Sequence, residues 1–181
     1  ATVIFAGTSQ QTVGGVTGDF TGTSRFNNLE INNPAGLVIG LNGVIEVNRR
    51  LLLTNGIIGT TNTNRMLLLS TDPDAVTPVG GQAGSFISGP LTKNINNGDA
   101  FRFPIGRGTD LGHAFTITST AGTTLAWTAE YFRPNPTATS IAPPLQVSNT
   151  QEYWSVSAAA PATAKIKAGW DPQSELTPLM T

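Results

Sequence analysis

The chain has 181 residues, which is enough for one large domain or two small ones. Only 12% of the residues are charged and the formal net charge is -1, so neither nucleic acid nor a membrane surface is an expected partner. With 20 glycines, 12 prolines and no cysteine, the composition excludes disulfides and thiolate metal sites and favours short strands over helices. We therefore expect an all-β protein that does not insert into a membrane.

Residues 1–70 consist of short apolar runs separated by turns rich in Asn and Gly. Leu29 and Ile31 are followed 22 residues later by Leu51 and Leu53, with further runs at intervals near seven residues. This spacing predicts a β-solenoid-like part with three short faces per coil. A β-meander with Asn-Gly hairpins predicts the same strands and remains the alternative. The expected inward column comprises Leu29, Ile31, Val38, Ile45, Val47, Leu51 and Leu53.

Residues 71–85 contain two prolines and a cluster of glycines, and we predict a connecting loop there. From residue 86 to residue 181 the runs are longer and alternate between apolar and polar positions. Period-2 alternation with regular turns is typical of an antiparallel β-sandwich. The expected sandwich core comprises Phe101, Phe103, Phe115, Ile117, Leu125, Trp127, Tyr153 and Ile166.

Five short motifs, taken in order, resemble a module of very large surface and secreted proteins of Bacteroidetes, of the kind exported by the type IX secretion system. They are Phe26-Asn27-Asn28-Leu29-Glu30-Ile31-Asn32-Asn33, Leu51-Leu52-Leu53-Thr54-Asn55-Gly56-Ile57-Ile58, Phe86-Ile87-Ser88-Gly89-Pro90-Leu91, Phe101-Arg102-Phe103-Pro104-Ile105-Gly106 and Glu152-Tyr153-Trp154. The resemblance implies a structural or adhesive role at the cell exterior, in a protein that often carries a separate sorting domain.

The first apolar run consists of Thr2, Val3, Ile4 and Phe5 and carries no charge. An unguarded strand at the end of a solenoid exposes backbone N–H and C=O groups. We predict that it pairs with a neighbouring module or an identical subunit by β-strand addition. The sequence opens at Ala1 rather than Met, and we expect a processed protein or a piece of a larger one.

The sequence offers little for catalysis, because His113 is its single histidine. It follows Leu111-Gly112 and is expected to be a turn or surface residue, so we predict no catalytic site and no cofactor. A polysaccharide-degrading solenoid needs a groove with paired acids. Arg49, Arg50 and Arg65 are available in the first part, but Glu30 and Glu46 are its only glutamates.

Calcium is the one ion that the sequence suggests. Asp72 and Asp74 flank Pro73 in the expected connecting loop, and loop carboxylates are ligands that calcium prefers. A calcium loop usually supplies more clustered carboxylates, so the favoured interpretation is that these aspartates stabilise a turn.

Exposed aromatic rings stack well on the faces of sugars, and the second part is rich in them. Trp127, Tyr131, Trp154 and Trp170 are the candidate ligand-facing aromatics, with Phe132 and Tyr153 beside them. The sequence therefore predicts a non-enzymatic structural or adhesive module of an extracellular bacterial surface protein or filament. A carbohydrate-binding module that contacts surface glycans is the alternative.

Overall fold

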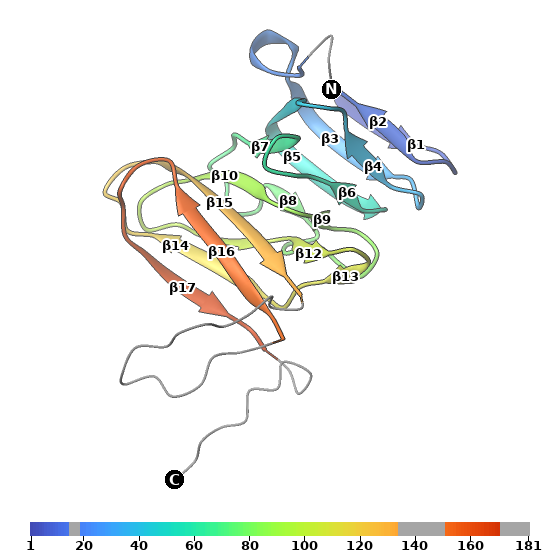
Figure 1. Ribbon diagram of the computed structural model, residues 1–181. Helices are drawn as coiled ribbons and strands as arrows, with labels where there is room; N and C mark the ends of the chain where they lie inside the picture. Colours follow the sequence, from blue (N-terminus) through green and yellow to red (C-terminus); the bar gives the residue numbers. More distant parts are fainter. Residues whose placement is uncertain (15–18, 134–150, 171–181) are drawn as a thin grey trace.

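A computed structural model describes residues 1–14, 19–133 and 151–170. The protein is all-β, with a solenoid-like arrangement of about four turns followed by additional sheets, as the sequence predicted (Figure 1). The segments 134–150 and 171–181 of the predicted sandwich lie outside the described residues.

Three sheets account for the strands of the described residues. The eight-stranded sheet contains β1 (Thr2–Ala6), β3 (Phe26–Asn32), β5 (Val44–Asn55), β7 (Arg65–Leu68), β8 (Val76–Thr77), β10 (Leu91–Ile95), β15 (Leu125–Phe132) and β16 (Tyr153–Ala158). The six-stranded sheet contains β2 (Gln11–Val13), β4 (Leu37–Ile39), β6 (Ile58–Gly59), β9 (Ile87–Ser88), β12 (Ile105–Arg107) and β13 (Asp110–Leu111). The three-stranded sheet contains β11 (Ala100–Phe103), β14 (Phe115–Ser119) and β17 (Ala164–Ala168). A short 3-10 helix spans Gly22–Ser24.

Strand direction decides between the solenoid and the meander. In the large sheet β1, β3, β5, β7 and β10 all pair in parallel. In the six-stranded sheet β2, β4, β6, β9 and β12 do the same. A meander would pair its strands antiparallel through tight hairpins. The chain instead winds from one sheet to the other and back, which is the path of a solenoid.

The solenoid interior consists of columns of side chains in register. Leu29, Leu51 and Val76 are successive partners on β3, β5 and β8, and all are buried. Parallel strands place identical faces above one another, so an apolar residue recurring once per coil adds to the same column. The 22-residue recurrence in the sequence therefore corresponds to one turn of the solenoid.

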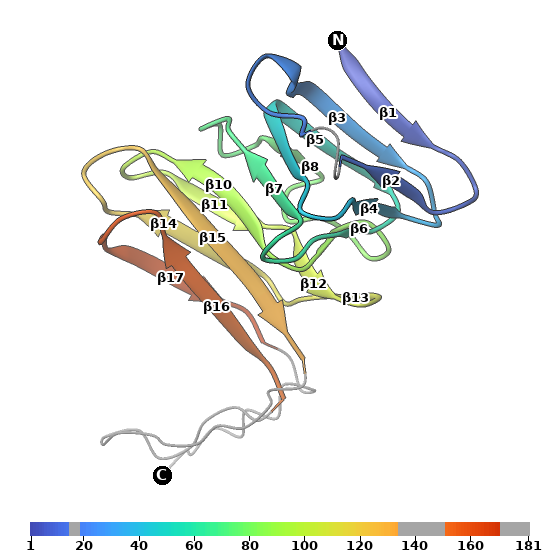
Figure 2. The same ribbon diagram turned by 45° about the horizontal axis from the view of Figure 1, so that its top comes forward.

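A second column runs through Phe26, Val47, Leu68, Lys93 and Trp127, so it crosses from the solenoid into the sandwich. β10 pairs in parallel with β7 on one side and antiparallel with β15 on the other. The large sheet thus passes from the solenoid to the sandwich without a break (Figure 2). The segment 71–85, predicted as a connecting loop, contains β8, which pairs with β5.

The sandwich packs the three-stranded sheet against the end of the large sheet. Phe101, Phe103, Phe115, Ile117 and Trp127 from the predicted core are buried in the same apolar cluster as the solenoid residues. Aromatic contacts contribute to the packing between the two layers. The ring of Phe115 on β14 stacks on Trp154 of β16, with centroids 5.6 Å apart and planes at 11°.

Four predicted core residues are not fully buried, and strand geometry explains each. Val38 faces outward, because its neighbours on both sides in β4 point inward. Tyr153 pairs with Phe132 on the outer face of β16. Leu125 faces inward but begins β15 and is only partly buried. Ile166 pairs with buried Ile117, but it lies on an edge strand and is 50% exposed.

The corners of the solenoid are held by short polar contacts. Asn33 is fully buried and donates from Nδ2 to the carbonyl oxygen of Ser9 at 2.7 Å and to Oε1 of Gln11 at 3.0 Å. In the next coil Gly56 lies directly against the carbonyl oxygen of Asn33. The N–H of Gly56 in turn donates to the carbonyl of Gly84 at 3.0 Å. Successive coils therefore meet at a corner with no room for a side chain at Gly56.

Candidate functional site

The predicted strand-addition edge lies at the start of the solenoid. β1 pairs in parallel with β3 from Thr2 to Ala6, and within residues 1–14, 19–133 and 151–170 it has no second strand partner. The side chain of Asn28 on β3 donates to the hydroxyl of Thr2 at 3.4 Å. The opposite side of β1 is a sheet edge within these residues, which is the type of surface that β-strand addition uses.

Val3 and Phe5 face the interior of the first coil. Val3 is in register with Leu29 and Phe5 with Ile31, and both of these partners are fully buried. Val3 itself remains 43% exposed, and the outward-facing Ile4 is 55% exposed. Val3 is therefore the last apolar side chain of its interior column, and it is still in contact with solvent. A further strand would bury it.

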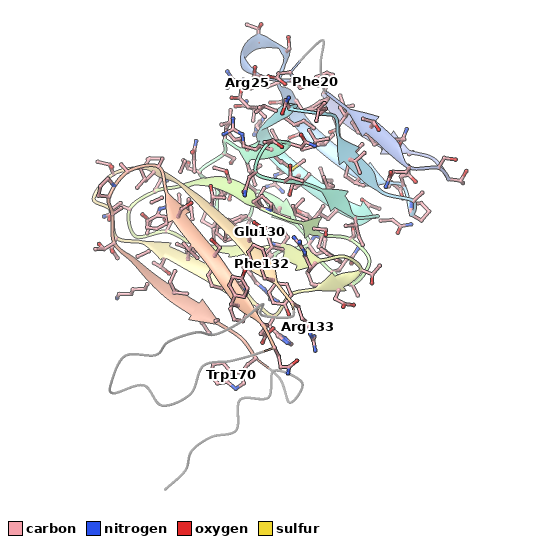
Figure 3. The ribbon with its side chains drawn as sticks, viewed as in Figure 1. Phe20, Arg25, Glu130, Phe132, Arg133 and Trp170 are labelled. Atoms are coloured by element: carbon pink, nitrogen blue, oxygen red, sulfur yellow. The ribbon has the colours of Figure 1, made fainter. Side chains whose placement is uncertain are left out.

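The four candidate ligand-facing aromatics do not share one surface. Trp127 and Tyr131 are buried in the sandwich, where the indole Nε1 of Trp127 donates to Oγ of Ser119 at 3.3 Å. Trp154 is partly buried and packs between the layers. Only Trp170 of these four is strongly exposed, at 67% (Figure 3). Alternation along β15 and β16 directs three of the four rings inward.

The outer face of the same strands carries a different aromatic pair. Phe132 stacks on Tyr153 with centroids 4.5 Å apart and planes at 4°. The guanidinium of Arg107 lies 5.4 Å from the centroid of Phe132 and pairs with Glu130 at 3.2 Å. Burial raises the pKa of Glu130, and Arg107 acts in the opposite direction. Because the Arg107 and Tyr153 side chains both contact Phe132, this cluster links β12, β15 and β16 rather than presenting a free ring.

His113, predicted to be a turn or surface residue, is partly buried and lies beside a buried carboxylate. The carboxylate of Glu152 accepts a hydrogen bond from the Tyr131 hydroxyl at 2.7 Å and lies 3.5 Å from Nε2 of His113. Burial and the hydrogen bond to Glu152 raise the pKa of Tyr131. The sequence motif Glu152-Tyr153-Trp154 includes this carboxylate, but nothing in the local sequence indicated its contacts with Tyr131 and His113. The cluster joins β15 to the start of β16.

The acidic residues considered for calcium form a turn. Oδ1 of Asp72 accepts the backbone N–H of Asp74 at 2.8 Å, which is the hydrogen bond of an Asx turn. Asp72 also lies 3.9 Å from a guanidinium nitrogen of Arg50. In the part of the chain that the structure describes, no group of three or more His, Cys, Asp or Glu side chains is placed to hold a metal ion.

Two surface depressions within the described residues adjoin the solenoid and reach residues of the sandwich part. One, of about 340 Å³, is polar and is lined by Arg49, Arg50, Ser70, Thr71, Asp72, Pro73, Asn96 and Asp99. The other, of about 530 Å³, follows the six-stranded sheet and is lined by Gln10, Pro34, Ala35, Gly36, Leu37, Val38, Asn55, Ile57, Gly59, Gly84, Ser88, Gly108 and Thr109. Neither lining includes an aromatic side chain or a glutamate.

Among the residues that the structure describes, Lys93 is a charged side chain in an interior column. Its Nζ donates to the carbonyl oxygens of Ser70 and Asn94 and lies 5.0 Å from the centroid of the Phe101 ring. Burial lowers the pKa of Lys93 to about 8, while Asp72 and Asp99 oppose that shift. The alternation Leu91-Thr92-Lys93-Asn94-Ile95 places it inward, so the sequence did hold the signal for this residue.

Lys93 is expected to make the protein more stable as the pH rises from about 8 toward 10. In this range the unfolded chain keeps the lysine proton, because the usual pKa of lysine is about 10.5, while the folded protein releases it. The unfolded state then binds more protons, so the free energy of unfolding increases with pH. The urea midpoint measured across this range should rise for the wild type and stay flat for Lys93→Met. A wild-type midpoint that falls with pH would contradict the assignment.

Comparisons with protein-family models, with curated proteins and with solved structures found no match for this chain. No helix within the described residues is long and apolar enough to span a membrane.

Proposed function

We propose that this chain is a non-enzymatic structural and adhesive module of an extracellular bacterial surface protein or filament. The observation that carries the proposal is the continuous large sheet, which begins at β1 in the solenoid and ends at β16 in the sandwich. One apolar cluster underlies both parts. Such a body transmits a load through main-chain hydrogen bonds and stacked side chains. The motifs that resemble Bacteroidetes surface modules support a location at the cell exterior.

The polar groups considered for catalysis or ion binding make structural contacts, which supports a non-enzymatic role. Glu152 is buried against Tyr131 and His113, and Asp72 holds a turn. Among the candidate aromatics only Trp170 is strongly exposed, whereas a sugar-stacking platform needs several exposed rings. The geometry therefore favours the structural role over the carbohydrate-binding alternative.

Force spectroscopy on the full chain, held at its two ends, tests the structural role. We expect resistance to extension followed by abrupt unfolding events. Release of one coil of 22 residues adds roughly 75 Å of contour length, at about 3.3–3.6 Å per extended residue. Smooth extension without such events would contradict a load-bearing role.

Labelling of intact cells tests the location separately. An antibody raised against the folded chain should bind intact cells of the source organism, and mild protease treatment of those cells should remove the signal. Labelling that requires permeabilised cells would contradict a place on the cell surface.

A further inference from the structure

We infer that copies of this chain join head to tail, with the free edge of β16 in one copy pairing in parallel with the free edge of β1 in the next. The inference rests on the proposed structural role and names its partner as a second copy of the same chain. Four features of the large sheet support it: the position of its edges, their composition, their direction and the side chains that they expose.

The two edges lie at opposite ends of the molecule (Figures 1 and 2). The strand order of the large sheet begins with β1 and ends with β16, and each has one strand partner within the described residues. An edge strand presents a row of backbone groups that is ready to pair with another chain. Copies stacked along the sheet would bring the end of one against the start of the next.

Neither edge carries the features that natural proteins use to prevent pairing. β1 reads Thr-Val-Ile-Phe-Ala and β16 reads Tyr-Trp-Ser-Val-Ser-Ala, with no charge and no proline. The edge strand β17 of the three-stranded sheet differs, because Lys165 and Lys167 flank Ile166 there. Lysines on an edge discourage association. Within the described residues, the chain therefore protects an edge of the smaller sheet and leaves one side of both β1 and β16 without a strand partner.

The directions of the two edges also match. β1, β3, β5, β7 and β10 are parallel, β15 is antiparallel to β10, and β16 is antiparallel to β15. β16 therefore runs the same way as β1. Two copies related by translation and a rotation about the stacking axis would pair these strands in parallel, as β1 already pairs with β3.

The exposed apolar side chains complete the match. Val156 of β16 is in register with buried Ala129 and faces the sandwich interior, yet it is 36% exposed. Val3 of β1 likewise faces the interior and is exposed at the other end. Joining the edges would bring both valines to the inner face of one extended sheet and withdraw them from water.

A joint of this kind uses different surfaces on its two partners. It does not close by two-fold symmetry, so each added copy leaves a free edge for another. Because β-sheets twist with a fixed hand, successive copies would be rotated and an open helical filament would result. In such a filament, β16 at the end of the large sheet in one copy pairs with β1 at the start of the large sheet in the next copy.

Two blocking variants of the full chain test the inference. Val3→Lys and Val156→Lys each place a charge where the joint would bury it, although the monomer leaves both positions accessible. Mass measured by light scattering after size-exclusion chromatography should rise with concentration for the wild type. Each variant alone should remain monomeric, because every copy keeps the same single usable edge and no copy offers the complementary edge. An equimolar mixture of the two should form a complex of twice the monomer mass and stop there.

Val79→Lys, in the exposed segment between β8 and β9 and in neither edge strand of the large sheet, is the matched control and should assemble like the wild type. Wild-type protein that stays monomeric at every concentration would overturn the inference. So would a mixture of the blocked variants that stays monomeric. Dimers abolished by Val3→Lys but unaffected by Val156→Lys would indicate symmetric pairing of β1 with β1, which contradicts the head-to-tail joint.

Circular dichroism and thermal melting must show that each variant is folded. If an inward lysine prevents folding, Ile4→Lys and Ser155→Lys place the charge on the outer face of the same edges, where both side chains are exposed. Either should raise the concentration needed for assembly, and unchanged assembly in both would overturn the inference. A monomeric chain that still resists force would refute the joint while leaving the structural role intact. A chain that assembles but extends smoothly under force would support the joint and refute the load-bearing role.

Discussion

Replacing Gly56 by alanine is expected to destabilise the protein by more than about 3 kcal/mol. Gly56 has φ +104°, and an added Cβ would lie 1.9 Å from the carbonyl oxygen of Asn33 in the preceding coil. The backbone has to move at a corner where Asn33 is fully buried and hydrogen-bonded to the first coil. Urea denaturation followed by circular dichroism measures the loss.

Gly98→Ala separates the two causes of that loss. Gly98 has φ +86°, but a Cβ there would meet no atom within 4 Å. The left-handed conformation alone costs about 1–2 kcal/mol in a non-glycine residue. Gly98→Ala should therefore be clearly less damaging than Gly56→Ala. Equal losses for the two variants would show that the contact between coils contributes little.

Truncation of Leu51 to alanine is the second change with a large expected effect, a loss of about 3 kcal/mol within a usual range of about 2–5. Leu51 is fully buried in the middle of its column, between Leu29 and Val76. The cavity would have coils on both sides, and stacked strands cannot easily collapse into it. The free energy of unfolding from urea denaturation checks this value.

Leu52 provides the control within the same strand. It is the next residue of β5, faces outward and is only partly buried. Leu52→Ala should cost less than about 1 kcal/mol, because it removes fewer buried contacts. A loss as large as that for Leu51→Ala would mean that the alternation assigned to this strand is wrong.

The solenoid was predictable because its signal repeats. Leu29 and Leu51 occupy equivalent positions one coil apart, and the parallel register places them in one column. Spacing alone did not exclude a meander, since short strands with Asn-Gly turns suit both folds. Only the pairing partners distinguish them, and these are set by contacts between residues far apart in the sequence.

The position of side chains at strand edges was harder to predict. Ile166 alternates as an inward residue and does face the interior, but no strand covers it within the described residues. Burial depends on what lies beyond a strand, and a single-sequence pattern does not report that. The same reasoning explains why Val3 is inward-facing and exposed at once.

The polar contacts of the interior could be predicted from the sequence only in part. Lys93 occupies an inward position of the alternation Leu91-Thr92-Lys93-Asn94-Ile95, but the sequence analysis did not single it out. The carbonyl oxygens that receive its hydrogen bonds come in part from Ser70, which is 23 residues away. The cluster of Tyr131, Glu152 and His113 also brings together three separate segments. Clusters of this kind arise from topology, and local spacing does not indicate them.

The order of strands in the sandwich determines whether the first and last strands of the large sheet run in the same direction. Two reversals of direction, at β15 and again at β16, return the last strand to the orientation of the first. An even number of reversals lets translation-related copies reproduce the evenly spaced hydrogen bonds of parallel strands. A relative lacking one of these two strands would have an odd number of reversals. Its edge strands would then pair antiparallel, with hydrogen bonds in alternating close and wide pairs.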